Sequence, residues 1–355
     1  MLLRYSTTIN YYYLKIHLLK SRQLLHHKQK CVASGKKYFH TQQEPWWRQN
    51  SFERRSVTKP NYEQPYSELL TLFYQLVQSR SGEKIAPGDE WQGEAQWLCR
   101  KLFRHLISIK SLCEPREDRP PGVPAVLYID HSSVQVITRA AMETFLVYFY
   151  VYGENDPPKS KFRHNTWYLG GLLDRQKLKT LASGSEFDTQ LAGDRLEIGR
   201  LRAEIEASPN FVAYPTKQQR RLLDGDWKTG TNWGDIAVSA GFHRTYFDNM
   251  YSHCCGYSHS SYISAMQGAQ ARDLAAQRML AEVNLGFGLQ IMTHFIKSYS
   301  RTVGSARAIL AGDPEARRLV DRWHLAAQEW ENLYNPAPKA ESHSTLRDTT
   351  MRWTQ

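Results

Sequence analysis

The sequence predicts an all-α fold, an antiparallel bundle of about eight to ten helices between two tails. Apolar residues recur at three- and four-residue intervals in one segment after another, which is the spacing of a helix face. No segment of useful length alternates apolar and polar residues, as a half-buried strand does. Hydrophobic residues make up 41% of the chain, a share typical of folded domains.

The expected helices follow one another from residue 64 to 334, and we treat this stretch as one helical domain. Cap and breaker residues bound most of them: Asp89 and Asp130 can start a helix, while Gly153 and Gly241 can end one. The prolines of residues 114–124 indicate a loop. The segments with helical patterns are 64–81, 89–113, 129–153, 159–182, 186–207, 216–224, 231–240, 260–301 and 314–334. In the charged segment 186–207 the predicted apolar stripe is Leu191, Leu196, Ile198, Leu201 and Ile205.

Residues 1–63 are expected to form a basic disordered tail and a linker, and residues 335–355 a polar disordered tail. Residues 1–43 hold eight Lys or Arg and no acid, so they supply +8 of the net charge of +11. This tail fits an organellar transit peptide, a disordered basic arm or a miscalled start. The small remaining charge is weak evidence for a nucleic-acid face on the folded part.

The most apolar segment, residues 129–153, is expected to be a buried core helix. Its apolar run from Ala140 to Tyr152 is about 13 residues long and includes Glu143, whereas a membrane span needs about 20. Five cysteines at irregular spacing favour a reducing compartment over a disulfide framework. We therefore expect a cytoplasmic protein with no membrane partner, of unknown oligomeric state.

Two charged residues on this apolar helix are the first candidate site. Arg139 and Glu143 lie four positions apart, so they share one face. Charges within a core helix are costly unless they are paired or reach a solvated cleft. Two interpretations stay open: a buried structural ion pair, or the floor of a binding cleft.

The second candidate is the cluster His253, Cys254, Cys255 and His259. On a helix, Cys255 and His259 have the spacing of paired zinc ligands. A structural zinc site needs four ligands, and no second Cys or His pair occurs at a metal-like spacing. The sequence therefore predicts no metal and no cofactor.

The third candidate is the pair Trp227 and Trp233, with Gly230 and Gly234 close by. Aromatic plugs that close one end of the bundle are the favoured interpretation, and a lid or ligand-stacking surface is the alternative. No phosphate-binding loop is present, because the paired glycines elsewhere sit inside helical patterns without the preceding strand that such a loop requires.

Residues 130–153 and 227–267 resemble a group of bacterial helical proteins placed near the HEPN superfamily, whose members bind nucleotides and are often ribonucleases. The first match is the run RAAMETFLVYFYVYG. The second is the set Tyr246, Tyr251, Ser252, His259, Ser260 and Ser261. The resemblance implies a HEPN-like antiparallel bundle with a polar patch where the Arg139 helix faces the His259 helix.

In active HEPN ribonucleases, an Arg and a His with four to six residues between them supply the cleavage chemistry. This chain departs from that pattern, because eight residues separate Arg244 from His253. The permitted spacing occurs elsewhere at about the frequency expected by chance. Those pairs are Arg22 with His27, Arg100 with His105, and Arg317 or Arg318 with His324.

The leading hypothesis is a HEPN-like module that binds nucleotide or RNA. Arg139, with Glu143 beside it, would bind a phosphate group. If the protein is an enzyme, we expect a ribonuclease first, with His259 as the general base. Tyr251 or His253 would orient the ligand or stack on it. The alternative is a non-enzymatic protein that docks a protein partner through the charged helix 186–207 or an exposed aromatic surface. A third class is a membrane-surface protein that uses the basic tail.

Overall fold

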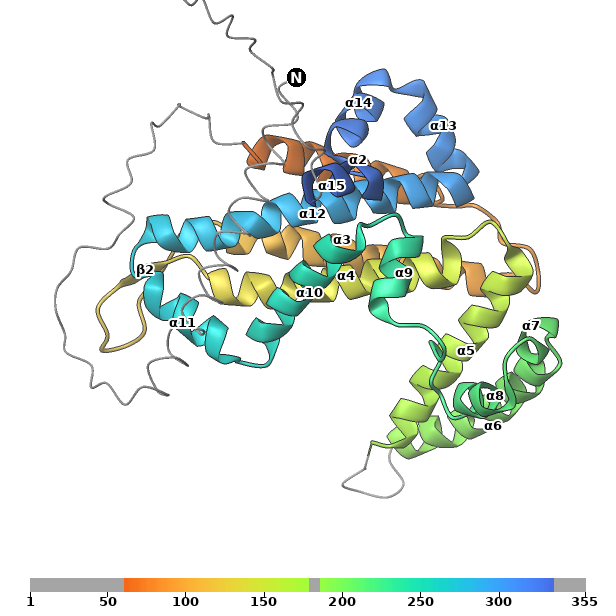
Figure 1. Cartoon of the computed structure of the whole chain (residues 1–355). Coiled ribbons are helices and arrows are strands. Elements are labelled where there is room, and N and C mark those ends of the chain that lie inside the picture. Colours follow the sequence, from red (N-terminus) through yellow and green to blue (C-terminus); the bar gives the residue numbers. More distant parts are fainter. Residues whose placement is uncertain (1–60, 179–185, 335–355) are drawn as a thin grey trace, which may run out of the picture.

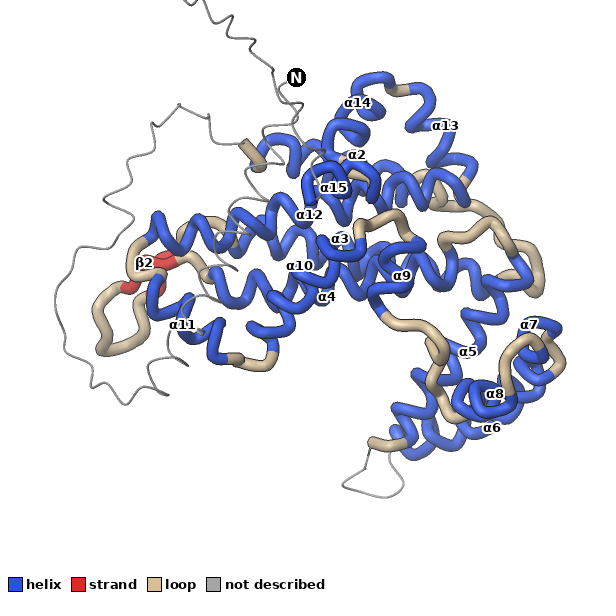
Figure 2. Tube along the Cα trace, viewed as in Figure 1, coloured by secondary structure: helices blue, strands red, loops and turns tan. Residues whose placement is uncertain are grey.

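The computed structural model describes residues 61–178 and 186–334, and almost all of the regular structure in these ranges is helical (Figures 1 and 2). The predicted all-α class is confirmed. The number of helices exceeds the expected eight to ten, because two predicted segments are each broken into two helices and because the helices Pro209–Val212, Arg244–Ser258 and Gly304–Gly312 lie between the predicted segments. The predicted tails lie outside the described residues, apart from a few positions before the first helix.

The main body is built around four long helices that pack side by side (Figure 1). Their apolar faces form one large core, in which aromatic rings stack on one another; Phe295 lies 4.3 Å from Phe73 and 5.0 Å from Tyr148 between ring centroids. The four helices are α2 (Glu63–Gln78), α3 (Ala95–Leu112), α4 (His131–Tyr152) and α12 (Leu274–Thr302).

Shorter helices cover this core. On one side, α9 (Trp233–Ser239) and α10 (Arg244–Ser258) pack against α4, and α11 (Tyr262–Gln270) follows α10. On the other, α13 (Gly304–Gly312) and α14 (Pro314–Trp323) pack over α2 and α12. The last helix, α15 (Ala327–Tyr334), contacts α10, where Trp330 stacks on Tyr246 at 3.9 Å between ring centroids.

A smaller lobe projects from the body (Figure 1). Helix α5 (Pro157–Gln176) leads into it, and α6 (Glu186–Glu206), α7 (Pro209–Val212) and α8 (Thr216–Leu223) pack against α5. The lobe has its own apolar core, separate from that of the body. Its buried members are Phe162, Leu169, Leu172, Ile198, Leu201, Ile205, Phe211 and Leu222.

The predicted loop at residues 114–124 is part of a β-hairpin, which the sequence analysis missed. Strand β1 (Arg116–Asp118) pairs antiparallel with β2 (Val126–Tyr128), with Arg116 opposite Tyr128. The strands are three residues long and mostly exposed, so no buried face imposes the alternation by which a strand is recognised.

Two predicted long helices are wrong. The segment 260–301 breaks before Leu274, where the Asp273 carboxylate accepts a hydrogen bond from the backbone N–H of Ala276 at 2.8 Å and so starts α12. The segment 314–334 ends its first helix at Trp323, and α15 begins at Ala327. In both cases the apolar pattern continues through the break, which hides it.

Two smaller expectations also fail. Asp89 makes no side-chain cap, and a 3₁₀ turn, Glu90–Glu94, precedes α3 instead. Leu196, predicted on the apolar stripe of α6, is 80% exposed, whereas Asp194 on that helix is buried and paired with Arg175 at 2.6 Å. Among the described ranges, no helix has the length and apolar character to cross a membrane.

Candidate active site between α4 and α10

Helix α4 places Arg139 and Glu143 on its one partly open face. Asp130 caps the helix, accepting from the backbone N–H of Ser133 at 2.9 Å, which sets where the helix begins. Most of the following turns are buried in the body core. Arg139 and Glu143 remain 23% and 31% exposed, so their charges are not sealed in the core.

Helix α10 supplies the opposite wall. His243 is the N-cap, and Gly241 adopts the positive φ of 96° that a C′ residue needs to end α9, as predicted. Tyr251 lies two turns into α10. His259 follows the last helical residue and is exposed to solvent.

The structure brings four of the five predicted site residues together. Arg139 donates from Nε to the Glu143 carboxylate at 3.0 Å, and its Nη1 lies 3.2 Å from Nε2 of His259. The Tyr251 hydroxyl donates to the same carboxylate at 2.7 Å and lies 3.5 Å from Nη2 of Arg139. Residues 120 positions apart in the chain therefore meet in one cluster, which we call the Arg139 cluster.

The contacts fix the proton positions in the Arg139 cluster. Arginine can only donate hydrogen bonds, so Nε2 of His259 acts as the acceptor and carries a lone pair facing the guanidinium. Burial, followed by the hydrogen bond to Glu143, raises the pKa of Tyr251 well above its ordinary value. Burial alone would lower the pKa of Arg139, but its bonds to Glu143 and Tyr251 raise it. The guanidinium is therefore a permanent cation beside a neutral phenol.

His253, the fifth predicted residue, belongs to a different side of α10. It lies two residues after Tyr251, and a helix turns by about 100° per residue, so the two side chains leave the helix in nearly opposite directions. Its ring packs edge-on against Tyr257 at 5.3 Å, toward α11. We therefore remove His253 from the candidate site.

Cys255 is a neighbour of the Arg139 cluster that the sequence analysis considered only as a zinc ligand. Its thiol interacts with Tyr251, and the charges of Arg139 and Glu143 act on it electrostatically. Burial raises its pKa, so the thiol stays protonated at neutral pH. Cys254 is fully buried against Gln135, at 3.5 Å. Among residues 61–178 and 186–334, no group of three or more His, Cys, Asp or Glu side chains is arranged to hold a metal ion.

The other Arg and His residues compared with the HEPN pattern lie outside the Arg139 cluster. Arg244 forms ion pairs with Asp235 at 2.8 Å and Asp248 at 2.7 Å on the surface. His105 and His324 are partly buried, and burial lowers the pKa of each, that of His324 to about 4. Arg22 and His27 lie outside the described residues.

Trp227 and Trp233 pack edge-to-face at 6.0 Å against the body core, as expected of aromatic plugs. Trp227 also lies 5.7 Å from Tyr150 at the end of α4. The ammonium of Lys228 lies 5.0 Å from the Trp233 ring. The loop that carries these residues is the return connection from the lobe to the body (Figure 2).

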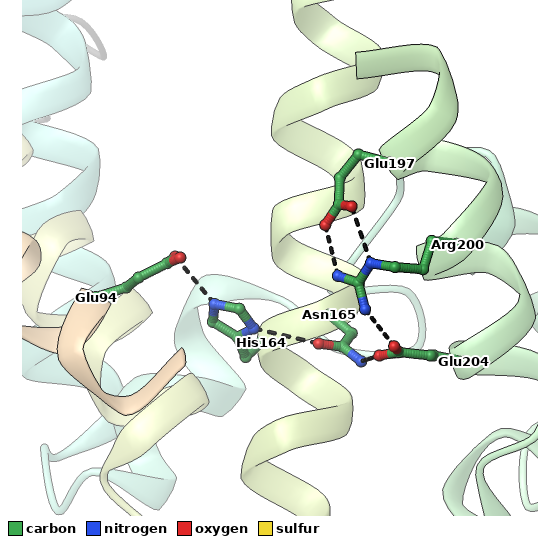
Figure 3. Close-up of polar contacts among 6 residues, drawn as sticks. All are labelled: Glu94, His164, Asn165, Glu197, Arg200 and Glu204. Carbon is green, nitrogen blue, oxygen red and sulfur yellow. Dashed lines mark hydrogen bonds and ion pairs between the residues drawn. The ribbon is translucent and has the colours of Figure 1, made fainter. Parts of the chain in front are cut away.

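A chain of polar contacts, which no sequence pattern indicated, links the lobe to the body; it is buried at His164 and exposed at Arg200 (Figure 3). His164 on α5 is 4% exposed, and its Nε2 donates to Glu94 of the 3₁₀ turn at 3.0 Å. Asn165 donates to Glu204 on α6 at 3.0 Å, and Arg200 joins Glu204 to Glu197. Sequence separations of 39 and 70 residues leave no periodic signal to read.

Comparison with known proteins identifies no relative of this chain. The chain matches no family model, and no curated protein or solved structure is significantly similar to it.

Proposed function

We propose that this protein is a HEPN-like helical module that binds the phosphate groups of nucleotide or RNA at the Arg139 cluster. The observation that carries the proposal is the 3.2 Å approach of the Arg139 guanidinium to the His259 imidazole, at a solvent-exposed edge between two helices. An arginine held beside a histidine is a pairing suited to phosphate, because the guanidinium supplies charge and the imidazole can supply a proton acceptor.

The contacts indicate where a phosphate would enter. Glu143 and Tyr251 hold the Nε and Nη2 side of the guanidinium. The Nη1 side faces His259, the most exposed member of the Arg139 cluster. A phosphate oxygen would replace the imidazole as the acceptor of Nη1, which would free the Nε2 lone pair of His259.

If the protein cleaves RNA, the freed lone pair is the general base. Nε2 of His259 would take the proton from a ribose 2′-hydroxyl as that oxygen attacks the adjacent phosphorus. Arg139 would stabilise the charge that builds on the phosphoryl oxygens. The bond from phosphorus to the 5′-oxygen would break as the 2′-oxygen attacks, and solvent water would protonate the leaving 5′-oxygen.

The test is the affinity for a short fluorescent single-stranded RNA and for a fluorescent ATP analogue, measured by polarisation over a range of salt. Arg139→Gln should weaken binding of RNA and reduce the log–log salt slope by about 0.7, the value for one lost phosphate contact. Arg244→Gln is the matched control, because Arg244 is also an exposed, carboxylate-paired arginine. Equal losses in both variants, or none in Arg139→Gln, would reject the site.

Cleavage is tested separately with the same RNA. We expect His259→Ala to abolish any cleavage and His324→Ala, outside the Arg139 cluster, to retain it. Cleavage that survives in His259→Ala would show that this histidine is not the base, whatever the binding result.

A second candidate function is docking of a protein partner by the lobe. Two large apolar side chains there are strongly exposed, Leu196 at 80% and Val212 at 73%. Exposed apolar residues are common singly, so this observation is weaker than the geometry of the Arg139 cluster. Leu196→Glu should leave RNA binding intact and abolish co-purification of a partner if the lobe is the docking surface.

A further inference from the structure

A polar cavity of about 200 Å³ lies at the junction between the body and the lobe. Its walls come from the end of α4, from α5, from the start of α8 and from the connection that returns to α9. The residues that matter for its chemistry are Glu154, Arg163, Gln218, Thr229 and Thr231. At about 30 Å³ per water molecule in the liquid, the space matches about six waters or a small metabolite.

The returning connection, residues 224–232, closes this space, and Figure 2 shows it running back along α5 toward α9. Two glycines let it approach closely. A Cβ at Gly170 of α5 would lie 2.8 Å from the carbonyl oxygen of Gly225, so the backbones touch there. Gly230 has φ +81° and lies against Gln218, where any side chain would be strained.

The charge at this cavity favours an anion. Arg163 is 13% exposed and lies 4.1 Å over the Tyr150 ring. Through Nη1 it donates to the Tyr150 carbonyl and to Glu154, both at 2.8 Å. Lys159 also donates to Glu154, at 2.7 Å, so two cations share one carboxylate. Burial alone would raise the pKa of Glu154, but its hydrogen bonds with Lys159 and Arg163 hold this pKa below its ordinary value.

Part of the Arg163 guanidinium is still available. A guanidinium has five N–H donors, and the two bonds above use only Nη1. Within the described ranges, the remaining donors of Arg163 meet the Tyr150 hydroxyl, a neutral acceptor that a phosphate or carboxylate would displace. These adjacent donors form the fork that binds carboxylate or phosphate through two parallel bonds.

Thr229 gives an independent indication of a ligand. It lines the cavity and is 3% exposed, yet its hydroxyl has no hydrogen-bond partner among the described residues. A buried polar group without a partner is destabilising and uncommon in folded proteins. A ligand oxygen in the cavity would satisfy it.

We propose that this cavity binds a small organic anion, whose phosphate or carboxylate group is recognised by the remaining donors of Arg163 and by the Thr229 hydroxyl. The site is distinct from the Arg139 cluster. Arg139 and Tyr150 are eleven residues apart on α4, which corresponds to about 16 Å along the helix axis. A bound anion would contact α5, the return connection and the body at once, so it would also stabilise the position of the lobe.

The experiment uses isothermal titration of inorganic phosphate and, separately, malonate at constant ionic strength. The parent protein carries Arg139→Gln, so the Arg139 cluster contributes no anion binding. A negative result for the proposed function at that cluster therefore stays separate from a negative result at the cavity. Saturable binding of one anion is expected, and the anion that binds identifies the group. Arg163→Gln should weaken it at least ten-fold, and Thr229→Val about five-fold.

Thr229→Val keeps the test decisive if Arg163→Gln does not fold. It preserves the shape of the side chain and removes an unpartnered hydroxyl, so its stability without anion should match or exceed that of the parent. The control is Ser298→Ala, which removes another buried, unpartnered hydroxyl that does not line the cavity and should leave affinity unchanged. Absence of saturable binding, or equal affinity in Thr229→Val and the parent, would overturn the proposal.

Discussion

At the scale of single residues, the guanidinium of Arg139 is shared among a carboxylate, a phenol and an imidazole. Glu143 orients the arginine, which favours binding of an anion, but its negative charge also opposes binding. The solvent exposure of the two side chains decides which effect is larger. With both side chains partly open to water, the pair contributes well under 1 kcal/mol to folding, whereas its charge acts directly on any phosphate bound at Nη1.

The first prediction is that Glu143→Gln tightens RNA binding about three-fold. The Glu143 carboxylate and a phosphate at Nη1 would lie on opposite sides of the guanidinium, about 7 Å apart, so removing the negative charge is worth about 0.6 kcal/mol in water. The amide still accepts from Tyr251, so the stability to urea should change little. Polarisation titrations at low salt measure the gain, and it should fade as salt rises. Weaker binding in Glu143→Gln would mean that orientation outweighs charge and that the phosphate lies elsewhere.

The second prediction concerns His294 and His324, whose rings lie 4.3 Å apart in the body. Burial lowers the pKa of His294 to about 3 and that of His324 to about 4, and Lys297 contributes to both shifts. Both are depressed below the ordinary 6.5, so the unfolded chain binds protons first as pH falls. Stability is therefore full above pH 6.5 and is lost as pH falls toward 4, by at most about 1.4 kcal/mol per unit for each histidine.

Urea unfolding at several pH values measures this slope. His324→Gln should flatten it, because one of the two groups no longer titrates. His259→Gln is the control and should leave the slope unchanged, since His259 is exposed. A stability that stays constant between pH 7 and 5 would contradict the buried, neutral state of the pair.

At the scale of elements, caps decide where helices begin when the apolar pattern does not. The third prediction is that Asp273→Ala lowers the free energy of unfolding by about 1 kcal/mol, since it removes the bond to the backbone N–H of Ala276. Asp89→Ala is the matched control, because Asp89 precedes a helical turn without capping it. Urea unfolding compares the two. Equal effects would show that the cap does not stabilise α12.

The same contrast shows how much of the fold the sequence could predict. Helix α2 was expected from its apolar spacing, and α4 also from a cap that the structure confirms at Asp130. The break at Asp273 was missed because a potential cap inside an apolar pattern looks like any exposed acid. The exposure of Leu196 was missed because a stripe read from sequence does not say which neighbour covers it.

The candidate site was predictable only in part. The i, i+4 spacing placed Arg139 beside Glu143, but only the resemblance suggested His259 as their neighbour. Orientation around α10 separates His253 from Tyr251, and this depends on which face of the helix meets α4. The cavity beside Thr229 was beyond prediction, since its walls come from four segments that meet only through packing.

At the scale of the whole molecule, two apolar cores are joined by polar contacts. The body and the lobe each bury their own side chains. Between them lie the chain from Glu94 through His164 to Glu204 (Figure 3) and the anion cavity. Polar contacts contribute less per area than apolar burial, and an unsatisfied partner is costly. The lobe should therefore open before the body does.

The fourth prediction is that His164→Ala loosens the lobe without unfolding the body. The change leaves Glu94 without its partner and opens space beside the stacked rings of Trp91 and Tyr152, which lie 5.8 and 6.1 Å from the imidazole. Hydrogen exchange followed by mass spectrometry should show faster exchange in α6 and α8 and unchanged protection in α4 and α12. Arg200→Gln, at the exposed end of the same chain, should have a smaller effect. Uniform acceleration across α4 and α12 would mean instead that body and lobe unfold as one cooperative unit.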